Sequence, residues 1–241
     1  MKFANYAVVM VATLLVALLG CTTKRGTGTE SSQRTVQLSE GEYLSSAYIE
    51  ALKSTRSPLA AGKTGELSSI SVQRDGKRFL LMPGYNFHEG DIEFAFQNDG
   101  SISPASPKDT WSEYTRNLSA SVLDDRTLRF GLGDDKPATY IFVKSATDYV
   151  SRIVLAGKYR DGRGRIYEFT EDGWAVFPDR KFRFEIGLDH VLDPFDYFMD
   201  GSKMWAFKRK GAELQIFPTS DANGPEEISS DRPYWTLREV R

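Results

Sequence analysis

The chain has 241 residues, of which 40% are hydrophobic and 27% are charged, and its formal net charge is −2 at pH 7. A balance this close to neutral gives no reason to expect nucleic acid as a partner. The chain contains a single cysteine, Cys21, which excludes an internal disulfide, and its length is sufficient to bury a core without such crosslinks.

The first residues have the pattern of an export signal. Lys2 supplies a positive charge, and residues 7–19 are apolar except for Thr13. As a helix this run would span about 20 Å, which is less than the roughly 30 Å of hydrocarbon in a bilayer. We therefore expect residues 1–20 to be a signal peptide rather than a transmembrane span.

The apolar run ends in Leu18-Leu19-Gly20-Cys21, which resembles the lipobox of bacterial lipoproteins. The resemblance implies that the signal is removed before Cys21 and that the cysteine carries lipid, with acyl chains such as palmitate, which holds the protein to a membrane. Thr22 stands where an aspartate would resemble an inner-membrane retention signal, and this favours the outer membrane, facing the periplasm. Acylation would leave no thiol for a nucleophile or a metal ligand. The alternatives are an ordinary secretory signal and a buried apolar helix with an incidental cysteine.

Residues 21–37 are rich in Ser, Thr, Gly, Lys, Arg and Gln and contain almost no apolar residues. Such a segment cannot bury enough surface to offset the entropy lost on ordering, so we expect a flexible lipidated tether. The folded domain would then comprise residues 38–241. Loss of Lys2 with the signal would change the formal net charge from −2 to −3.

A helical pattern opens the folded domain. Ser39 and Glu42 have the S-x-x-E spacing of a capping box, and apolar residues recur at helical intervals over 43–52. Ser57-Pro58 ends the pattern, because proline disfavours the helical conformation in the residue before it. We expect one amphipathic helix over about 40–55, with its apolar stripe packed on the core.

From Leu67 onward, apolar residues alternate with polar ones. The clearest run is 181–188, in which we expect Phe184 to be buried and Arg183 to be exposed. Asp-Gly pairs, which favour tight turns, separate such runs at positions 75, 99, 161, 172 and 200. Many short strands without intervening helices predict an antiparallel meander that forms a barrel of about 8–10 strands.

Two short motifs resemble those of a known fold. Gly157-Lys158-Tyr159 is similar to the G-x-W opening of lipocalin-like barrels, with tyrosine in place of tryptophan, and this likeness covers residues 157–217. Residues 86–90, downstream of the helix that ends at Ser57-Pro58, look like a segment of uncharacterised bacterial lipoproteins with a lipocalin-like barrel. Both resemblances imply a lipocalin-like (calycin-type) barrel, and neither implies an activity.

The chain also has a weak internal similarity. Residues 84–102 align without gaps on residues 157–175, with identical residues at four of the nineteen positions. The match indicates either a duplication with halves 67–156 and 157–241, or two hairpins that obey the same turn chemistry. A duplication would give one barrel from two four-stranded halves, or two small β units.

Few residues indicate catalysis. Both histidines, His88 and His190, have acidic neighbours, and His88 with Glu89 could perform acid–base chemistry. Adjacent residues on one strand point to opposite faces, however, so we expect both histidines to make local hydrogen bonds. Serine-hydrolase, phosphate-binding and metal-ligand motifs do not occur in the sequence, and we expect no catalytic residue, metal or cofactor.

The aromatic content is the feature most typical of a binding protein. Inward-facing rings of a barrel either fill its interior or line a ligand cavity. The residues expected to line such a cavity are His88, Glu89, Tyr159, Tyr167, Trp174 and Trp205. One expected function is a non-catalytic lipoprotein that binds a small apolar or amphipathic ligand inside the barrel. The alternative is a structural or protein-interaction lipoprotein of the envelope with a filled core, and a third is a hydrolase that uses His88 and Glu89.

Overall fold

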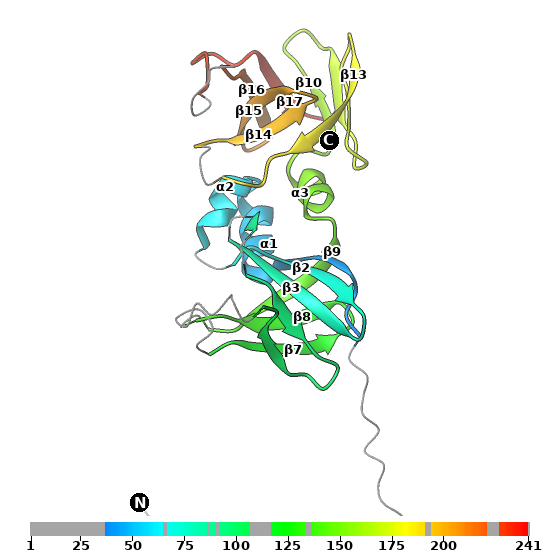
Figure 1. Cartoon of the computed structure of the whole chain (residues 1–241). Helices are drawn as coiled ribbons and strands as arrows, with labels where there is room; N and C mark the ends of the chain where they lie inside the picture. Colours follow the sequence, from blue (N-terminus) through cyan, green and yellow to red (C-terminus); the bar gives the residue numbers. More distant parts are fainter. Residues whose placement is uncertain are drawn as a thin grey trace, which may run out of the picture. The chain divides into compact units, whose positions relative to one another are not determined.

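The computed structural model of the chain describes residues 37–64, 67–85, 87–89, 92–106, 117–133, 136–190, 194–220 and 227–240, without the side chains of Tyr85, His88 and Glu89. Cys21, the predicted signal peptide and all of the predicted tether except Gln37 lie outside these residues. The described chain forms two antiparallel β units and three α-helices (Figure 1). The expected mainly β fold is therefore confirmed.

The first β unit is a strongly curved sheet of nine strands. The strands are β1 (Gly41–Ser45), β2 (Ser69–Asp75), β3 (Arg78–Tyr85), β4 (His88–Glu89), β5 (Phe94–Phe96), β6 (Ile102–Pro104), β7 (Ser119–Asp124), β8 (Thr127–Gly131) and β9 (Ala138–Lys144). They pair in the order β6-β5-β3-β2-β1-β9-β8-β7, with β4 added to β3. Curvature brings β5 and β8 together across the core, because the ring centres of Phe94 and Phe130 lie 5.8 Å apart.

The second β unit is a closed barrel of eight antiparallel strands. The strands are β10 (Gly157–Arg160), β11 (Ile166–Phe169), β12 (Trp174–Val176), β13 (Lys181–Ile186), β14 (Asp196–Asp200), β15 (Lys203–Lys210), β16 (Glu213–Pro218) and β17 (Trp235–Glu239). Each strand pairs with the next, and β17 pairs with β10 to close the barrel. The expected antiparallel meander barrel is confirmed, and it begins at the Gly157 of the lipocalin-like motif. Closure removes free sheet edges.

Alternation along β13 follows the expected register. Phe184 is 5% exposed and faces the barrel interior, whereas Arg183 is exposed. The Asp-Gly pairs at 172 and 200 form turns in which the glycines have φ values of +82° and +60°. That region of backbone conformation favours glycine, which explains the residue type at these two turns.

The predicted helix over 40–55 is correct only from Ser46. Helix α1 spans Ser46–Thr55, and its N-cap is Ser45, whose hydroxyl accepts a hydrogen bond from the Tyr48 amide. The capping box predicted at Ser39 and Glu42 is wrong, because residues 41–45 form β1. Strand β1 pairs with β2 on one side and with β9 on the other, so pairing with distant strands overrides the local helical pattern.

Two further helices were not predicted from the sequence. Helix α2 spans Pro58–Ala61 and is followed by a 3₁₀ turn, Gly62–Thr64. Helix α3 spans Ala146–Val154 and leads into the barrel. Glu42 has a role at α3, because its carboxylate accepts a hydrogen bond of 2.6 Å from the Ala146 amide. Within the described residues, no helix is both long and apolar enough to cross a membrane.

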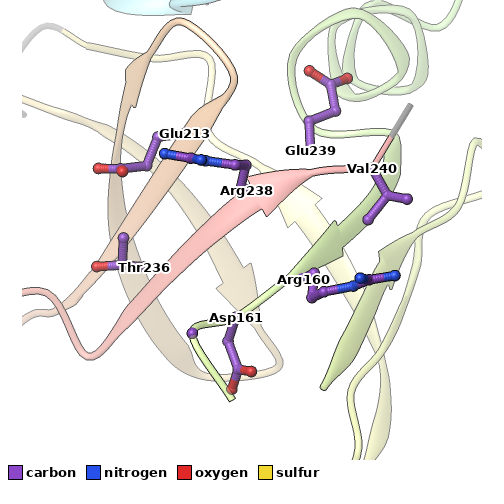
Figure 2. A pocket seen from close by; sticks show the side chains of 8 residues that line it. Arg160, Asp161, Glu213, Thr236, Arg238, Glu239 and Val240 are labelled. Atoms are coloured by element: carbon purple, nitrogen blue, oxygen red, sulfur yellow. The ribbon is translucent and has the colours of Figure 1, made fainter. Parts of the chain in front are cut away.

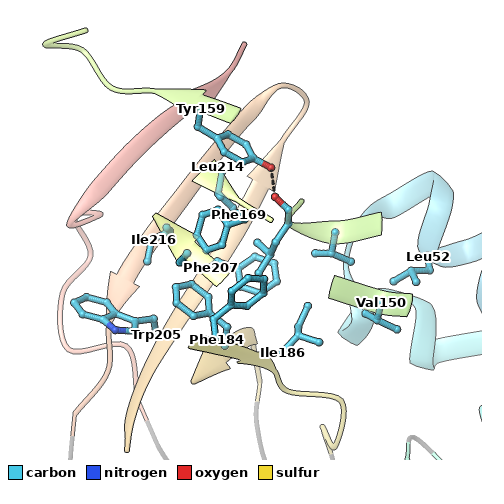
Figure 3. Packing of buried hydrophobic residues seen from close by; sticks show 14 of the residues in the cluster. Leu52, Val150, Tyr159, Phe169, Phe184, Ile186, Trp205, Phe207, Leu214 and Ile216 are labelled. Carbon is cyan, nitrogen blue, oxygen red and sulfur yellow. Dashed lines mark hydrogen bonds between the residues drawn. The ribbon is translucent and has the colours of Figure 1, made fainter. Parts of the chain in front are cut away.

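The helices α1 and α3 pack against the barrel in one shared hydrophobic core. Figure 3 shows Leu52 of α1 and Val150 of α3 on one side of the cluster, next to Ile186, with the barrel rings beyond them. Leu52 and Val150 are both completely buried. One end of the barrel is therefore closed by helices. The core of the first β unit is a separate cluster around Tyr43, Ile70 and Phe130.

Candidate binding surface at the mouth of the barrel

The interior of the barrel is filled with side chains. The ring of Phe169 lies edge-on to the rings of Phe177, Phe184 and Phe198, at centre-to-centre distances of 5.6, 5.2 and 5.7 Å. This edge-to-face geometry is typical of close aromatic packing. Figure 3 shows three further side chains that complete the filling, Phe207, Leu214 and Ile216. Leu237 is buried in the same cluster. A molecule could enter the interior only by displacing packed rings.

Tyr159 closes the barrel at the end covered by the helices. Its side chain is completely buried, and its hydroxyl donates a hydrogen bond of 2.6 Å to the carbonyl of Leu155. The guanidinium of Arg209 lies 5.3 Å from the centre of the Tyr159 ring and donates to its hydroxyl. Burial raises the pKa of Tyr159, so the hydroxyl keeps its proton. The contacts of Tyr159 are thus those of a structural residue.

Two arginines connect this closed end of the barrel to α3. Arg209 donates from Nε to the carbonyl of Val154 at 3.0 Å, and Arg56 donates from Nε to the carbonyl of Ile153 at 3.1 Å. Glu239 lies within 3.0 Å of Arg56 and 3.6 Å of Arg209. The arginines therefore satisfy carbonyls in the last turn of α3, which have no partner within a helix.

The other predicted site residues have different surroundings. Tyr167 is buried inside the barrel, where its ring lies 4.9 Å from that of Phe177. Trp174 lies on the outer face, because the next residue, Ala175, is the buried one, and Lys181 covers the Trp174 ring at 4.6 Å. Trp205 is inside the barrel and 4% exposed. The structure thus brings Tyr159, Tyr167 and Trp205 into one cluster and leaves Trp174 outside it.

His88 and Glu89 belong to the first β unit. Their backbones form β4, in register with Tyr85 and Gly84 of β3. Their side chains lie outside what the structure describes. The idea that these two residues act together in a site stays a prediction.

Strand β15 shows how the two ends of the barrel differ. Lys203, Trp205, Phe207 and Arg209 alternate along one face of this strand, and Trp205 and Phe207 belong to the buried cluster inside the barrel. Arg209 belongs to the end that the helices close. Lys203 and Trp205 therefore lie at the opposite end of the barrel.

At this opposite end, aromatic rings surround a guanidinium group. The guanidinium carbon of Arg180 lies 4.5 Å from the ring centre of Phe182 and 5.9 Å from those of both Trp205 and Trp235. Arg180 also pairs with Asp200, at a distance of 2.8 Å. Cations placed over aromatic faces are stabilised by the electrostatic field of the ring.

A second cation and an exposed ring complete this end. Lys203 places its ammonium 4.1 Å above the Trp205 ring. Tyr234 is 66% exposed, and its ring centre lies 4.4 Å from Trp235 and 5.7 Å from Trp205. We call the following residues the aromatic mouth: Arg180, Phe182, Lys203, Trp205, Tyr234 and Trp235. Of these residues the sequence predicts a site role for Trp205 alone, and the Asp-Gly pair at position 200 predicts the turn before Lys203.

A depression of about 460 Å³ lies on the outside of the barrel, along β10, β16 and β17 (Figure 2). Arg160 and Arg238 face each other in register across β10 and β17, yet Figure 2 shows their side chains pointing to opposite sides. Asp161 in the same depression already pairs with Arg165 at 2.8 Å. The described lining residues therefore do not converge on one point.

Another polar cluster is buried between the barrel and α2. The imidazole of His190 is 4% exposed, and its Nε2 lies 3.9 Å from Oδ1 of Asp196, which accepts a hydrogen bond from the Leu59 amide. Burial lowers the pKa of His190 to about 4 and raises the pKa of Asp196. His190 is therefore neutral at pH 7. The hydrogen bond expected for it is absent among the described residues.

Metal binding has no support in the described part of the chain, where no three ligand-type side chains gather. Comparison of the chain with protein-family models, curated proteins and solved structures finds no match. Function must therefore be inferred from the residues and their geometry.

Proposed function

We propose that this chain is a non-catalytic, lipid-anchored protein of the bacterial cell envelope that binds a partner protein through the aromatic mouth of its barrel. The anchor is inferred from the lipobox-like sequence Leu18-Leu19-Gly20-Cys21. It would hold the protein to the outer membrane, facing the periplasm.

The filled interior favours a protein that acts through its surface. A binding protein for a small ligand commonly encloses most of the ligand in a preformed cavity. Here Phe169, Phe198 and Phe207 occupy the corresponding space, each with no more than 1% of its surface exposed. Of the two main functions expected from the sequence, an interaction lipoprotein with a filled core is therefore the better supported.

The exposure of Tyr234 is the reason to choose the aromatic mouth as the binding surface. Its ring is 66% exposed although it lies edge-on to the ring of Trp235 at a centre-to-centre distance of 4.4 Å, so a large amphipathic side chain is presented at the surface. Tryptophan, tyrosine and arginine are the residues most enriched in the energetic centres of protein interfaces. The ring centre of Trp235 lies 4.4 Å from that of Tyr234 and 5.9 Å from the guanidinium carbon of Arg180, and aromatic side chains lose little conformational entropy on binding.

The proposal is tested by photo-crosslinking in the native envelope. A photoreactive amino acid replaces Tyr234 in one strain and Leu123 in another. Leu123 is a matched control because it is also a large exposed hydrophobic residue, 59% exposed, but lies on β7 of the first β unit. We expect one defined protein adduct from position 234 that is absent from position 123. Equal adducts from both positions, or none from position 234, would contradict the proposal.

A further inference from the structure

Building on the proposed function, we infer that the aromatic mouth recognises an acidic segment of its partner, in which carboxylates lie next to apolar side chains. The proposed function gives the location of the binding surface, and its side chains indicate the chemistry of the partner. The inference rests on three properties of the mouth: its cations, its hydrogen-bond donors and its exposed ring.

Two cations, Arg180 and Lys203, lie over the rings of the mouth, and one carboxylate, that of Asp200, pairs with one of these cations. Asp200 pairs with Arg180 at 2.8 Å. Lys203 is directly opposite Asp200 in the pairing of β14 with β15, yet its ammonium lies over the Trp205 ring instead. Among the described residues Lys203 has no ion pair closer than 4.0 Å. One positive charge at the mouth is thus available to an anionic group.

Hydrogen-bond donors are in excess there as well. Arg180 and Lys203 have only donors, and the indole Nε1 of Trp205 is buried without a hydrogen-bond partner among the described residues. Among the described residues, the carboxylate of Asp200 pairs with Arg180, but not with Lys203 or with the indole of Trp205. A further ionised carboxylate supplies acceptors only, so it is the group that best complements this set.

The exposed ring adds an apolar requirement. Tyr234 presents most of its surface to solvent, and Trp235 beside it is half-buried. Apolar side chains of a partner would bury this ring surface, while neighbouring carboxylates approach Lys203. A basic segment would be repelled by Arg180 and Lys203. A neutral glycan could stack on the rings but would leave the charge of Lys203 unpaired.

The test uses three peptides that differ only in charge: acetyl-Glu-Leu-Phe-Glu-amide and the forms with glutamine or lysine in place of both glutamates. Each is titrated into the full chain in detergent micelles, and the indole N–H resonances of the four tryptophans are followed by NMR. We expect the acidic peptide to shift the Trp205 resonance and to bind at least about fivefold more tightly than the glutamine peptide. Added salt should weaken this preference, because the charges are near the surface.

Two lysine variants provide the matched control. Lys203→Gln removes the cation over Trp205, and Lys181→Gln removes the similarly placed cation over Trp174 on the outer face, 4.6 Å from that ring. The preference for the acidic peptide should disappear in Lys203→Gln and persist in Lys181→Gln.

Three results would overturn the inference. They are equal affinity for the acidic and glutamine peptides, no shift of the Trp205 resonance at about 5 mM peptide, and a stronger response to maltotetraose, which would indicate a glycan site. Failure here is distinguishable from failure of the proposed function. If position 234 gives a defined adduct but the peptides bind with equal affinity, the aromatic mouth is still the binding surface, and its preference for an acidic segment is excluded.

Discussion

The guanidinium of Arg209 lies over the ring of Tyr159, and it donates hydrogen bonds both to the Tyr159 hydroxyl and to the carbonyl of Val154. This contact joins three parts of the closed end: β10, β15 and the last turn of α3. It also explains the Gly157-Lys158-Tyr159 motif. Gly157 has φ +145°, a conformation that other residues rarely adopt, and Tyr159 then points inward to meet Arg209.

Removal of the Arg209 side chain should therefore destabilise the protein strongly. Arg209→Leu leaves the Tyr159 hydroxyl and the Val154 carbonyl without this donor, and we expect a loss of about 2–4 kcal/mol in the free energy of unfolding. Denaturant titration measures the change. Arg160→Ala, an exposed arginine on β10, should stay within about 0.5 kcal/mol. Similar losses in both variants would show that the contact does not stabilise the barrel.

Gly187, which follows β13, has no room for a larger side chain. A Cβ atom at Gly187 would lie 2.0 Å from Cζ of Tyr197, so the ring covers the glycine directly. Gly187→Ala should cost about 1–3 kcal/mol, because the ring must move away. Gly162→Ala is the control, since a Cβ there meets no atom within 4 Å. Combining Gly187→Ala with Tyr197→Leu should recover part of the stability lost in Gly187→Ala. The melting temperatures of the variants measure these changes.

The lowered pKa of His190 makes the stability of the protein depend on pH. Its pKa is about 4 in the folded protein and about 6.5 when unfolded, so the unfolded state binds the proton first on acidification. The contribution of His190 is therefore complete above pH 6.5 and is lost as the pH falls toward 4. Between pH 7 and pH 5 the free energy of unfolding should therefore decrease by about 2 kcal/mol because of His190. The raised pKa of Asp196 acts in the opposite sense, because the folded state then takes up a proton before the unfolded state does.

The measurement is denaturant unfolding at pH 7 and pH 5 for the wild type and His190→Gln. The glutamine variant lacks the titrating imidazole, so it should lose less stability on acidification than the wild type does. If both proteins lose the same amount, a group other than His190 determines the pH dependence.

The lipid anchor is tested by metabolic labelling with a fatty-acid probe. Cys21→Ala should abolish labelling and leave the signal peptide uncleaved, because the lipobox-like sequence loses the residue that would be acylated. The wild-type chain should be labelled and found with membranes. Equal labelling of the two chains would exclude Cys21 as the lipidation site.

Local features of this fold could be predicted from the sequence because neighbouring residues determine them. The alternation that buries Phe184 and exposes Arg183 is one example, and the glycines of the Asp-Gly turns are another. The helix was placed too early because β1 is stabilised by strands far along the chain. Helix α3 was missed despite its Ser145 cap, since its apolar residues resemble part of the long β pattern.

The candidate site was harder to predict because barrel closure assembles it. Arg180 and Tyr234 lie in two separate connections between strands and Lys203 is the first residue of β15, so only the pairing of each strand with its neighbours brings them together. Trp174 and Trp205 looked equivalent as residues on predicted strands. The actual register places the first outside the barrel and the second inside, a difference that one position along a strand reverses.

If the aromatic mouth binds a partner protein, the Tyr234→Ala variant should bind that partner more weakly than the wild type does. With the partner captured at position 234, its dissociation constant is measured for the full chain carrying Tyr234→Ala or the matched Leu123→Ala. We predict about 30-fold weaker binding for Tyr234→Ala, as for an energetic centre of an interface, with an unchanged melting temperature. Leu123→Ala should bind like the wild type. Wild-type affinity in Tyr234→Ala would contradict the claim.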